Sequence, residues 1–143
     1  MDIQKVHPEL RKAYSRMPAL PVHNPGFHFI LSLLMKLIPA RIKPVAGVDI
    51  EDRAVGECTV RIFRPEAKAS GAGLLWIHGG GYIMGNAGMN DRECTALARE
   101  LKLVVVYVDY RLAPRHPFPA ALDDCFEAWN FMQKSAAEFG MDR

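Results

Sequence analysis

The sequence predicts an α/β fold, with a mostly parallel sheet, an antiparallel edge pair and helices on both faces. Residues 74–77 and 103–108 are continuous apolar runs, as expected of strands that are buried on both faces of a parallel sheet. A segment of helical composition lies between these runs, two strand-like segments precede them, and a long helical segment follows. Strands that alternate with helices in this order favour a doubly wound sheet.

The bulk composition is that of one soluble globular domain. Half of the 143 residues are hydrophobic, and 18 basic residues against 16 acidic ones leave a net charge of +2. Because no basic run is longer than two residues, the sequence predicts no nucleic-acid surface and favours small neutral partners. The three cysteines are widely spaced, which argues against a disulfide framework or a metal site and favours a cytoplasmic location. The apolar stretch at residues 27–38 is too short to predict a membrane span.

We expect residues 1–40 to form an N-terminal helical segment and residues 41–143 to form the core. Residues 4–17 mix charged and apolar side chains at the spacing of a short amphipathic helix, which the prolines that follow would end. Residues 27–38 predict an apolar helix with one narrow polar stripe. Such a helix packs against a core on most sides, and a second interpretation is that it also lines an apolar pocket.

Residues 45–50 and 58–65 predict the two strands of the antiparallel pair. The second strand alternates between two sets of side chains, which are Cys58, Val60 and Ile62 on one face and Thr59, Arg61 and Phe63 on the other. This alternation predicts one solvent-exposed face and a place at the edge of the sheet.

Two helices are expected in the core. Residues 90–101 have helical composition, and Asp91 and Glu93 lie in the first turn, where the helix dipole favours acidic side chains. Residues 120–139 predict a longer helix, and Gly140 is a natural stop for it.

A glycine cluster, His78-Gly79-Gly80-Gly81, directly follows the first buried run. A dinucleotide-binding fingerprint would need its third glycine at Met84, so that interpretation fails on spacing. A phosphate-binding P-loop would need Lys and Ser or Thr after Gly85, where Asn86 and Ala87 stand instead. Both phosphate-binding interpretations are therefore excluded.

An oxyanion hole is the third interpretation of the cluster. Consecutive glycines allow main-chain N–H groups to converge on a developing alkoxide, which a Cβ would obstruct. The His-Gly-Gly-Gly motif of lipases and esterases occupies this position after a strand. The alternative, a tight turn without chemistry, explains one or two glycines better than it explains this motif. We expect the His78 ring to hydrogen-bond the loop, because a general base needs a nucleophile within reach.

Two motifs together resemble the bacterial hormone-sensitive lipase family of α/β-hydrolases. They are residues 78–82, His-Gly-Gly-Gly-Tyr, and residues 109–121, which read Asp-Tyr-Arg-Leu-Ala-Pro-Arg-His-Pro-Phe-Pro-Ala-Ala. The resemblance spans the chain and implies the N-terminal portion of that fold, with residues 1–40 as part of its helical cap. It also implies an esterase for short-to-medium acyl esters that uses no cofactor, and some members of the family form dimers.

The resemblance assigns roles to individual residues. It implies that Gly80 and Gly81 supply the main-chain donors of the oxyanion hole, and that His78 and Gly79 shape the loop. Tyr82 would pack beside the acyl site as part of the substrate pocket. The scaffold around this site would consist of Asp109, Tyr110 and Arg111. One departure is Arg115, where the family usually has Glu, and this weakens the expectation of a salt bridge in the loop.

The catalytic residues themselves are not expected within these 143 residues. None of the serines lies in a Gly-x-Ser-x-Gly elbow, and in this class the acid and the base follow the serine in the chain. The resemblance therefore implies that the nucleophile, acid and base lie beyond Arg143, and we expect the chain alone to be inactive. Residues 74–77 would then keep an open apolar edge, which predicts instability or self-association.

Two alternatives to an esterase stay open at this point. One is a non-catalytic protein of the same fold that binds a small molecule in the pocket. The other is that the 143-residue product is real, as that of a decayed gene or as an interaction fragment. The sequence downstream of Arg143 would discriminate among the three.

Overall fold

The computed structural model describes residues 3–16, 21, 24, 26, 27, 30 and 45–142. The chain divides into two compact units, residues 1–30 and residues 31–143. No helix in the described part of the chain is long and apolar enough to cross a membrane.

The first unit contains a 3₁₀ turn, η1 (Ile3–Lys5), and the helix α1 (Pro8–Tyr14). Proline is well suited to the first turn of a helix, so α1 begins at Pro8. The Arg11 side chain donates from Nε to the carbonyl oxygen of Val6 at 2.9 Å, which ties the turn to the helix. The helix expected at residues 4–17 is therefore present in a shorter form. The helix expected at residues 27–38 falls almost entirely outside the described residues.

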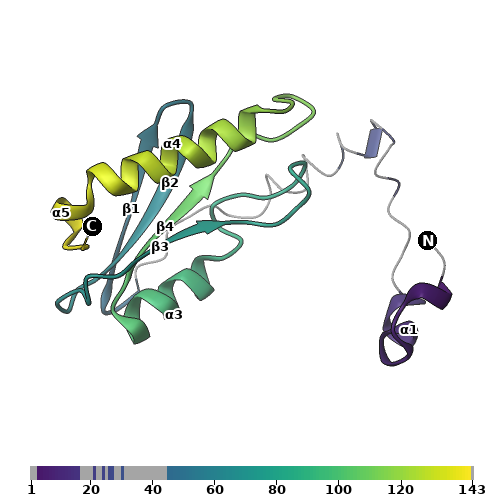
Figure 1. Ribbon diagram of the computed structural model, residues 1–143, viewed down its shortest axis with the longest axis horizontal. Coiled ribbons are helices and arrows are strands. Elements are labelled where there is room, and N and C mark those ends of the chain that lie inside the picture. The colour runs from purple at the N-terminus through teal and green to yellow at the C-terminus, as the bar shows by residue number, and fades with distance from the viewer. Residues whose placement is uncertain are drawn as a thin grey trace. The chain divides into compact units, whose positions relative to one another are not determined.

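The second unit is built on a four-stranded sheet with the order β1-β2-β4-β3 (Figure 1). Its strands are β1 (Val48–Val55), β2 (Cys58–Pro65), β3 (Gly73–Ile77) and β4 (Val104–Asp109). β1 and β4 each pair antiparallel with β2, whereas β3 and β4 pair in parallel. The antiparallel entry pair and the parallel β3–β4 unit are both confirmed. Within the described strands, however, the sheet is mixed rather than mostly parallel.

The structure differs from the sequence prediction in the place of β2 in the sheet and in the burial of β3. β2 is an interior strand, and its Arg61 and Phe63 side chains are 1% and 0% exposed. The predicted solvent-exposed face of β2 was therefore wrong, because α3 covers the face that carries these side chains. β1 is the edge strand instead, and its charged residues are typical of an edge. β3 forms the other edge of the described sheet, with Ile77 51% exposed, so its predicted burial on both faces was also wrong.

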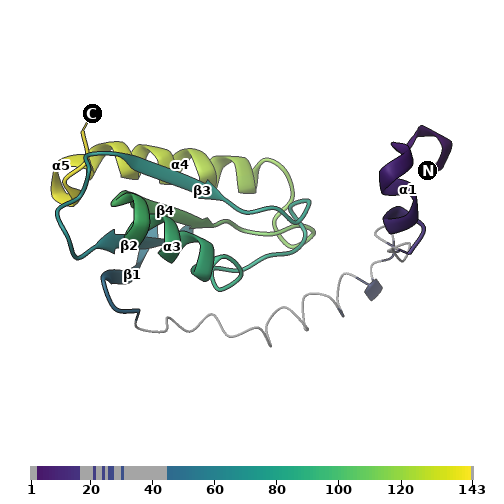
Figure 2. The same ribbon diagram turned by 90° about the horizontal axis from the view of Figure 1, so that it is seen from below.

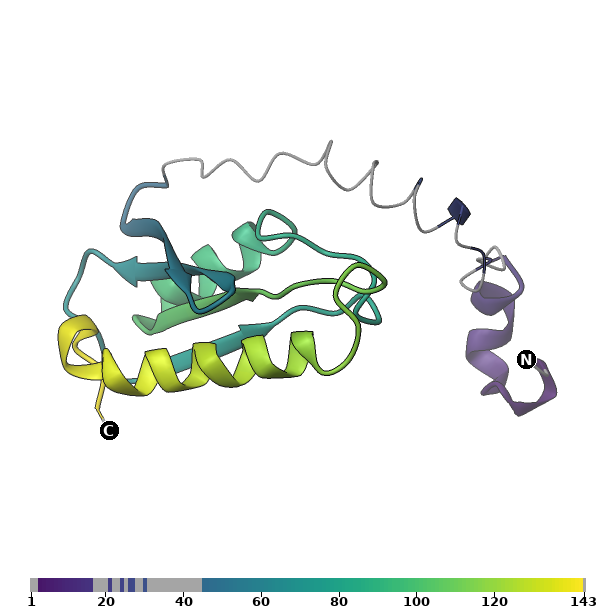
Figure 3. The same cartoon turned by 90° about the horizontal axis from the view of Figure 1, so that it is seen from above.

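Helices cover both faces of the sheet, as Figures 2 and 3 show. α3 (Asp91–Leu101) packs on the face that includes Phe63 and Val105. α4 (Ala120–Lys134) packs on the opposite face, and the short helix α5 (Ala136–Phe139) follows it. The single helix expected at residues 120–139 is thus interrupted at Ser135, while Gly140 ends α5 in a left-handed conformation as predicted.

Candidate functional site

The candidate site lies where the parallel strands β3 and β4 end. The glycine cluster directly follows β3, and Tyr110 directly follows β4. Because the carboxyl ends of parallel neighbours meet at one edge of a sheet, the two loops lie on the same side of the core (Figures 1 and 3). Ligands of open α/β sheets bind at this edge.

His78 is buried in a stack of aromatic rings at the base of the loop. Its ring lies parallel to that of Tyr110, with centroids 4.0 Å apart, and to that of Tyr107 at 5.6 Å. The Tyr110 hydroxyl donates to the main-chain carbonyl of His78 at 2.8 Å. Nδ1 of the ring lies 2.7 Å from the carbonyl oxygen of Gly79. Since a carbonyl oxygen only accepts, this contact requires the proton on Nδ1.

The glycines themselves adopt backbone conformations that side chains disfavour. Gly80 has φ +130° and Gly81 has φ +62°. A Cβ on Gly80 would fall 2.0 Å from the carbonyl oxygen of Met84, whereas one on Gly81 would meet open space. The Gly80 carbonyl accepts from the N–H groups of Ile83 and Met84. Among the described residues, no backbone hydrogen bond uses the N–H of Gly80 or Gly81 as its donor.

Beyond the glycines, the loop returns toward α3 along a segment that we call the return arm, residues 85–91. The Tyr107 hydroxyl donates to the carbonyl of Asn86 at 2.7 Å. The N–H of Ala87 donates to the carboxylate of Asp109. Burial raises the pKa of Asp109 above its ordinary value, and the bond from Ala87 only partly offsets this effect. Nη1 of Arg61 donates to the carbonyl of Ala87 at 3.3 Å. The return arm is thus fixed by side chains from β2 and β4.

Arg61 forms two ion pairs in the interior that the sequence analysis missed. Its Nε and Nη2 donate to the two carboxylate oxygens of Asp52 at 2.7 and 2.8 Å. Its Nη1 lies 3.0 and 2.9 Å from the carboxylate oxygens of Asp91, the first residue of α3. Hydrogen bonding to Asp52 raises the pKa of Arg61 above its ordinary value, although burial opposes it. One sequence signal could have indicated that Arg61 is buried. The apolar Phe63 lies on the same face of β2 as Arg61, and an apolar residue is unexpected on a solvent-exposed face.

Tyr82 links the glycine loop to the proline-rich loop after β4. It has φ +63° and is 60% exposed. Its carbonyl accepts from the N–H of Ala113 at 2.9 Å. Its ring lies 5.9 Å from that of Tyr110, tilted by 54°. The side chain at the position implied for the substrate pocket is therefore open to solvent and lies beside the aromatic stack.

Arg111 forms a second buried ion pair, which fixes the start of the proline-rich loop on α4. Its Nη2 lies 2.7 Å from Oδ1 of Asp124, and its main-chain N–H donates to Oδ2 at 2.8 Å. Asp124 is 2% exposed and was not singled out from the sequence. Arg115, the departure from the family pattern, takes part in no ion pair of the described residues.

The cysteine thiols are poor candidates for a nucleophile, because burial raises the pKa of each of them. Burial raises the pKa of Cys58 to about 11 and that of Cys94 to about 12, so neither is a ready thiolate. No group of His, Cys, Asp and Glu side chains in the described part of the chain is arranged to hold a metal ion.

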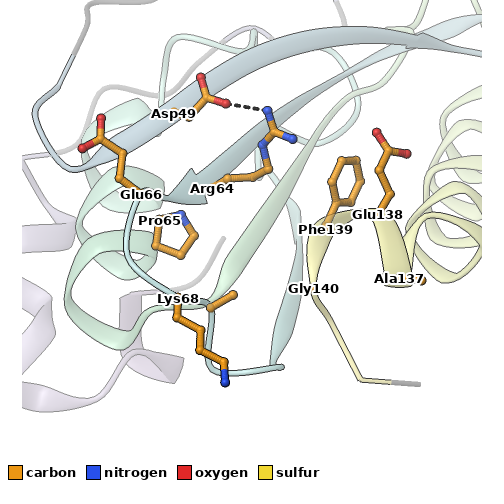
Figure 4. Close-up of a pocket in the computed structure, with 10 residues that line it drawn as sticks. Asp49, Arg64, Pro65, Glu66, Lys68, Ala137, Glu138, Phe139 and Gly140 are labelled. Carbon is orange, nitrogen blue, oxygen red and sulfur yellow. Dashed lines mark hydrogen bonds and ion pairs between the residues drawn. The ribbon is translucent and has the colours of Figure 1, made fainter.

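A cavity of about 480 Å³ lies at the other end of the sheet, between β2 and α5 (Figure 4). Arg64 pairs there with Asp49, and the ring of Phe139 lies beside it. No serine, cysteine or histidine lines this cavity. The glycine loop is therefore the stronger candidate for chemistry.

Known proteins resemble the part of the chain that carries both loops. Residues 74–143, which contain both loops, match the model of a family with the alpha/beta hydrolase fold. The chain belongs to the α/β-hydrolase family. The resemblance to the bacterial hormone-sensitive lipase family is confirmed, because relatives that match most of this chain are named as an esterase, a carboxylesterase and a hormone-sensitive lipase.

Three relatives illustrate the match. The chain is 41% identical over 86 residues to ethyl acetate hydrolase of Pseudomonas putida, covering 58% of this chain and 27% of that protein. It is 31% identical to Esterase LipI of Mycobacterium tuberculosis, covering 96% of this chain and 44% of the relative. The structure of a hormone-sensitive lipase from a metagenome library superposes with a TM-score of 0.63 at 29% identity, covering 96% of this chain and 44% of that one. The chain thus spans less than half the length of these relatives.

Proposed function

We propose that this chain supplies the oxyanion hole of a serine carboxylesterase that acts on short-to-medium acyl esters. The observation that carries the proposal is the open glycine loop at the end of β3. Gly80 and Gly81 have positive φ there, and their N–H groups are not used as donors by the backbone bonds of the described residues. Two such N–H groups are what a developing alkoxide needs.

In the proposed reaction, a serine hydroxyl attacks the carbonyl carbon of the ester while a histidine takes its proton. The carbonyl oxygen becomes an alkoxide and accepts hydrogen bonds from Gly80, Gly81 and the residue after the serine. The alkoxide then re-forms the carbonyl, the alcohol leaves with the proton from the histidine, and water releases the acid from the acyl-enzyme. His78 and Gly79 shape the loop, and no metal or cofactor takes part.

The catalytic serine, acid and base belong, in this proposal, to sequence beyond Arg143, so the 143 residues alone are inactive. Ser70 precedes β3 and Ser135 lies between α4 and α5, which are positions away from the glycine loop. Residues 1–40 would form part of a helical cap, and Tyr82 would lie beside the acyl group. The name of the Pseudomonas putida relative, ethyl acetate hydrolase, supports a preference for short esters. We also propose a cytoplasmic location for the protein.

Hydrolysis of p-nitrophenyl butyrate tests the proposal. The assay compares residues 1–143 with the intact protein, by which we mean the complete translated polypeptide that carries them. We expect turnover only by an intact protein that continues through a serine elbow, and we expect Gly80→Val to abolish it, because the new side chain would collide with Met84.

Two results would contradict the proposal. Turnover by residues 1–143 above that of their Gly80→Val variant would show that the chain is active by itself. An intact protein that binds the ester without hydrolysing it would instead favour a non-catalytic binding function.

A further inference from the structure

The middle of β2 holds a buried cation on a face of the sheet where an apolar cluster also lies. Arg61 is 1% exposed, and its neighbours Val60 and Ile62 are 0% exposed. Burying a guanidinium removes it from water, and a well-packed apolar residue is often at least as stabilising as a buried ion pair. The position of Arg61 therefore calls for an explanation beyond the stability of the sheet.

The guanidinium on β2 joins the edge strand β1 to the return arm and the start of α3. Asp52 on β1 occupies Nε and Nη2, and Asp91 at the start of α3 receives Nη1. Nη1 also donates to the main-chain carbonyl of Ala87 in the return arm. Because the planar guanidinium presents its donors in a fixed geometry, the paired carboxylates determine where the bond to Ala87 points.

The return arm in turn packs directly against the His78 ring. A Cβ on Gly85 would fall 2.0 Å from Cε1 and 2.9 Å from Nε2 of that ring. Tyr110 lies on the ring face, so the imidazole is confined between the return arm and the aromatic stack. The ring bonds to Gly79 through Nδ1, and Gly79 is joined directly to the glycines that carry the donors.

We propose that Arg61 is the positioning residue of the oxyanion hole: it fixes the return arm at Ala87, the arm confines His78, and His78 orients the N–H groups of Gly80 and Gly81. This proposal rests on the esterase function proposed above for its consequence in catalysis. Its structural part, that Arg61 orders the glycine loop, stands independently of that function.

The test substitutes Arg61 in the intact protein in two ways. Arg61→Met removes the cation at similar length, and Arg61→Lys keeps the charge but loses the planar fork, so at least the second variant is expected to fold. The matched control is Arg64→Met, since Arg64 is an arginine of the same strand that pairs with Asp49 and Glu51. Its guanidinium lies beside the ring of Phe139 of α5, away from the glycine loop (Figure 4).

We expect kcat on p-nitrophenyl butyrate to fall by about 100-fold for Arg61→Lys with KM nearly unchanged, because misplaced donors weaken only transition-state binding. Hydrogen exchange should accelerate at the amides of residues 79–87 but not at those of β4. Arg64→Met should leave both readouts as they are in the unsubstituted protein.

The proposal is overturned if Arg61→Lys folds and keeps both its kcat and the exchange rates of the loop. It is also overturned if exchange accelerates equally in β4, since Arg61 would then serve only the stability of the fold. If the unsubstituted intact protein hydrolyses no ester, the proposed function fails, and the exchange measurement alone decides the role of Arg61.

Discussion

Gly85 lies so close to His78 that a methyl group on its Cα would fall 2.0 Å from Cε1 of the imidazole ring. Its φ of +141° also belongs to the region that side chains rarely adopt. The return arm therefore approaches the ring without room for any side chain. Gly85 belongs to the site as much as the glycines of the His-Gly-Gly-Gly motif do, although it lies four residues after the motif.

The first prediction follows from this contact. Gly85→Ala should lower the free energy of unfolding by about 1–3 kcal/mol, because overpacking forces neighbouring groups apart. It should also lower kcat, because displacing the His78 ring disturbs its hydrogen bond to the Gly79 carbonyl and so shifts the adjacent glycines. Urea unfolding and ester hydrolysis of the intact protein measure the two effects.

The control for this prediction is the same substitution in a His78→Ala background. If the collision with the ring is the cause, Gly85→Ala should destabilise the His78→Ala protein less than it destabilises the original. An equal loss in both backgrounds would mean that backbone strain alone is responsible, and the contact would not matter.

Tyr110→Phe carries the second prediction. The substitution removes the hydroxyl that donates to the His78 carbonyl at 2.8 Å but keeps the ring that stacks on the imidazole. We expect a loss of about 0.5–1.5 kcal/mol in unfolding free energy, which is the usual contribution of one hydrogen bond. Tyr14→Phe, in α1 of the other unit, is the matched control. Chemical denaturation of both variants checks this, and equal stability of Tyr110→Phe and the unsubstituted protein would contradict it.

The elements that were predicted correctly have local signals. The apolar runs identified β3 and β4, acidic residues marked the first turn of α3, and Gly140 marked the end of α5. Each of these signals acts within a few residues of the feature that it predicts. The match to known relatives then came from two short motifs at the ends of β3 and β4.

What the sequence could not predict depends on contacts between distant segments. The alternation in β2 is equally consistent with one exposed face, and only the packing of α3 buries Arg61. Likewise, Asp124 looks like an ordinary surface acid of a helix until Arg111 is found beside it. The strand predicted at residues 45–50 is β1 at Val48–Val55, and the charged residues in its second half, which are typical of an edge strand, carry no apolar signal in the sequence.

The cysteines provide the third prediction. Since burial raises the pKa of Cys58 to about 11 and that of Cys94 to about 12, both thiols stay protonated near neutral pH. At pH 8 the reactive thiolate of Cys58 amounts to about one part in a thousand. Iodoacetamide should therefore leave both unmodified in the folded intact protein and alkylate all three cysteines in urea. Peptide mass mapping measures this, with reactivity rising as the pH approaches each pKa. Rapid native alkylation of Cys94 at pH 8 would contradict the predicted protection.

The open edge of β3 carries the last prediction. Residues 1–143 expressed alone should self-associate, because β3 carries no charge and Ile77 at its end is 51% exposed. Exposed apolar side chains on α4 add to this surface, namely Leu122, Phe126 and Trp129. Burying an isoleucine contributes about 1.5–3 kcal/mol, so Ile77→Lys should weaken the association by about tenfold or more.

Sedimentation velocity over a concentration series measures this effect. Leu101→Lys is the matched control, because Leu101 is 56% exposed but ends α3, on the face opposite α4. If Ile77→Lys and Leu101→Lys weaken the association equally, the general loss of apolar surface explains the effect and the β3 edge has no special part. A monomeric chain with one cooperative thermal unfolding transition would contradict the predicted self-association. It would show that the exposed β3 edge and the α4 side chains are compatible with a stable, soluble unit.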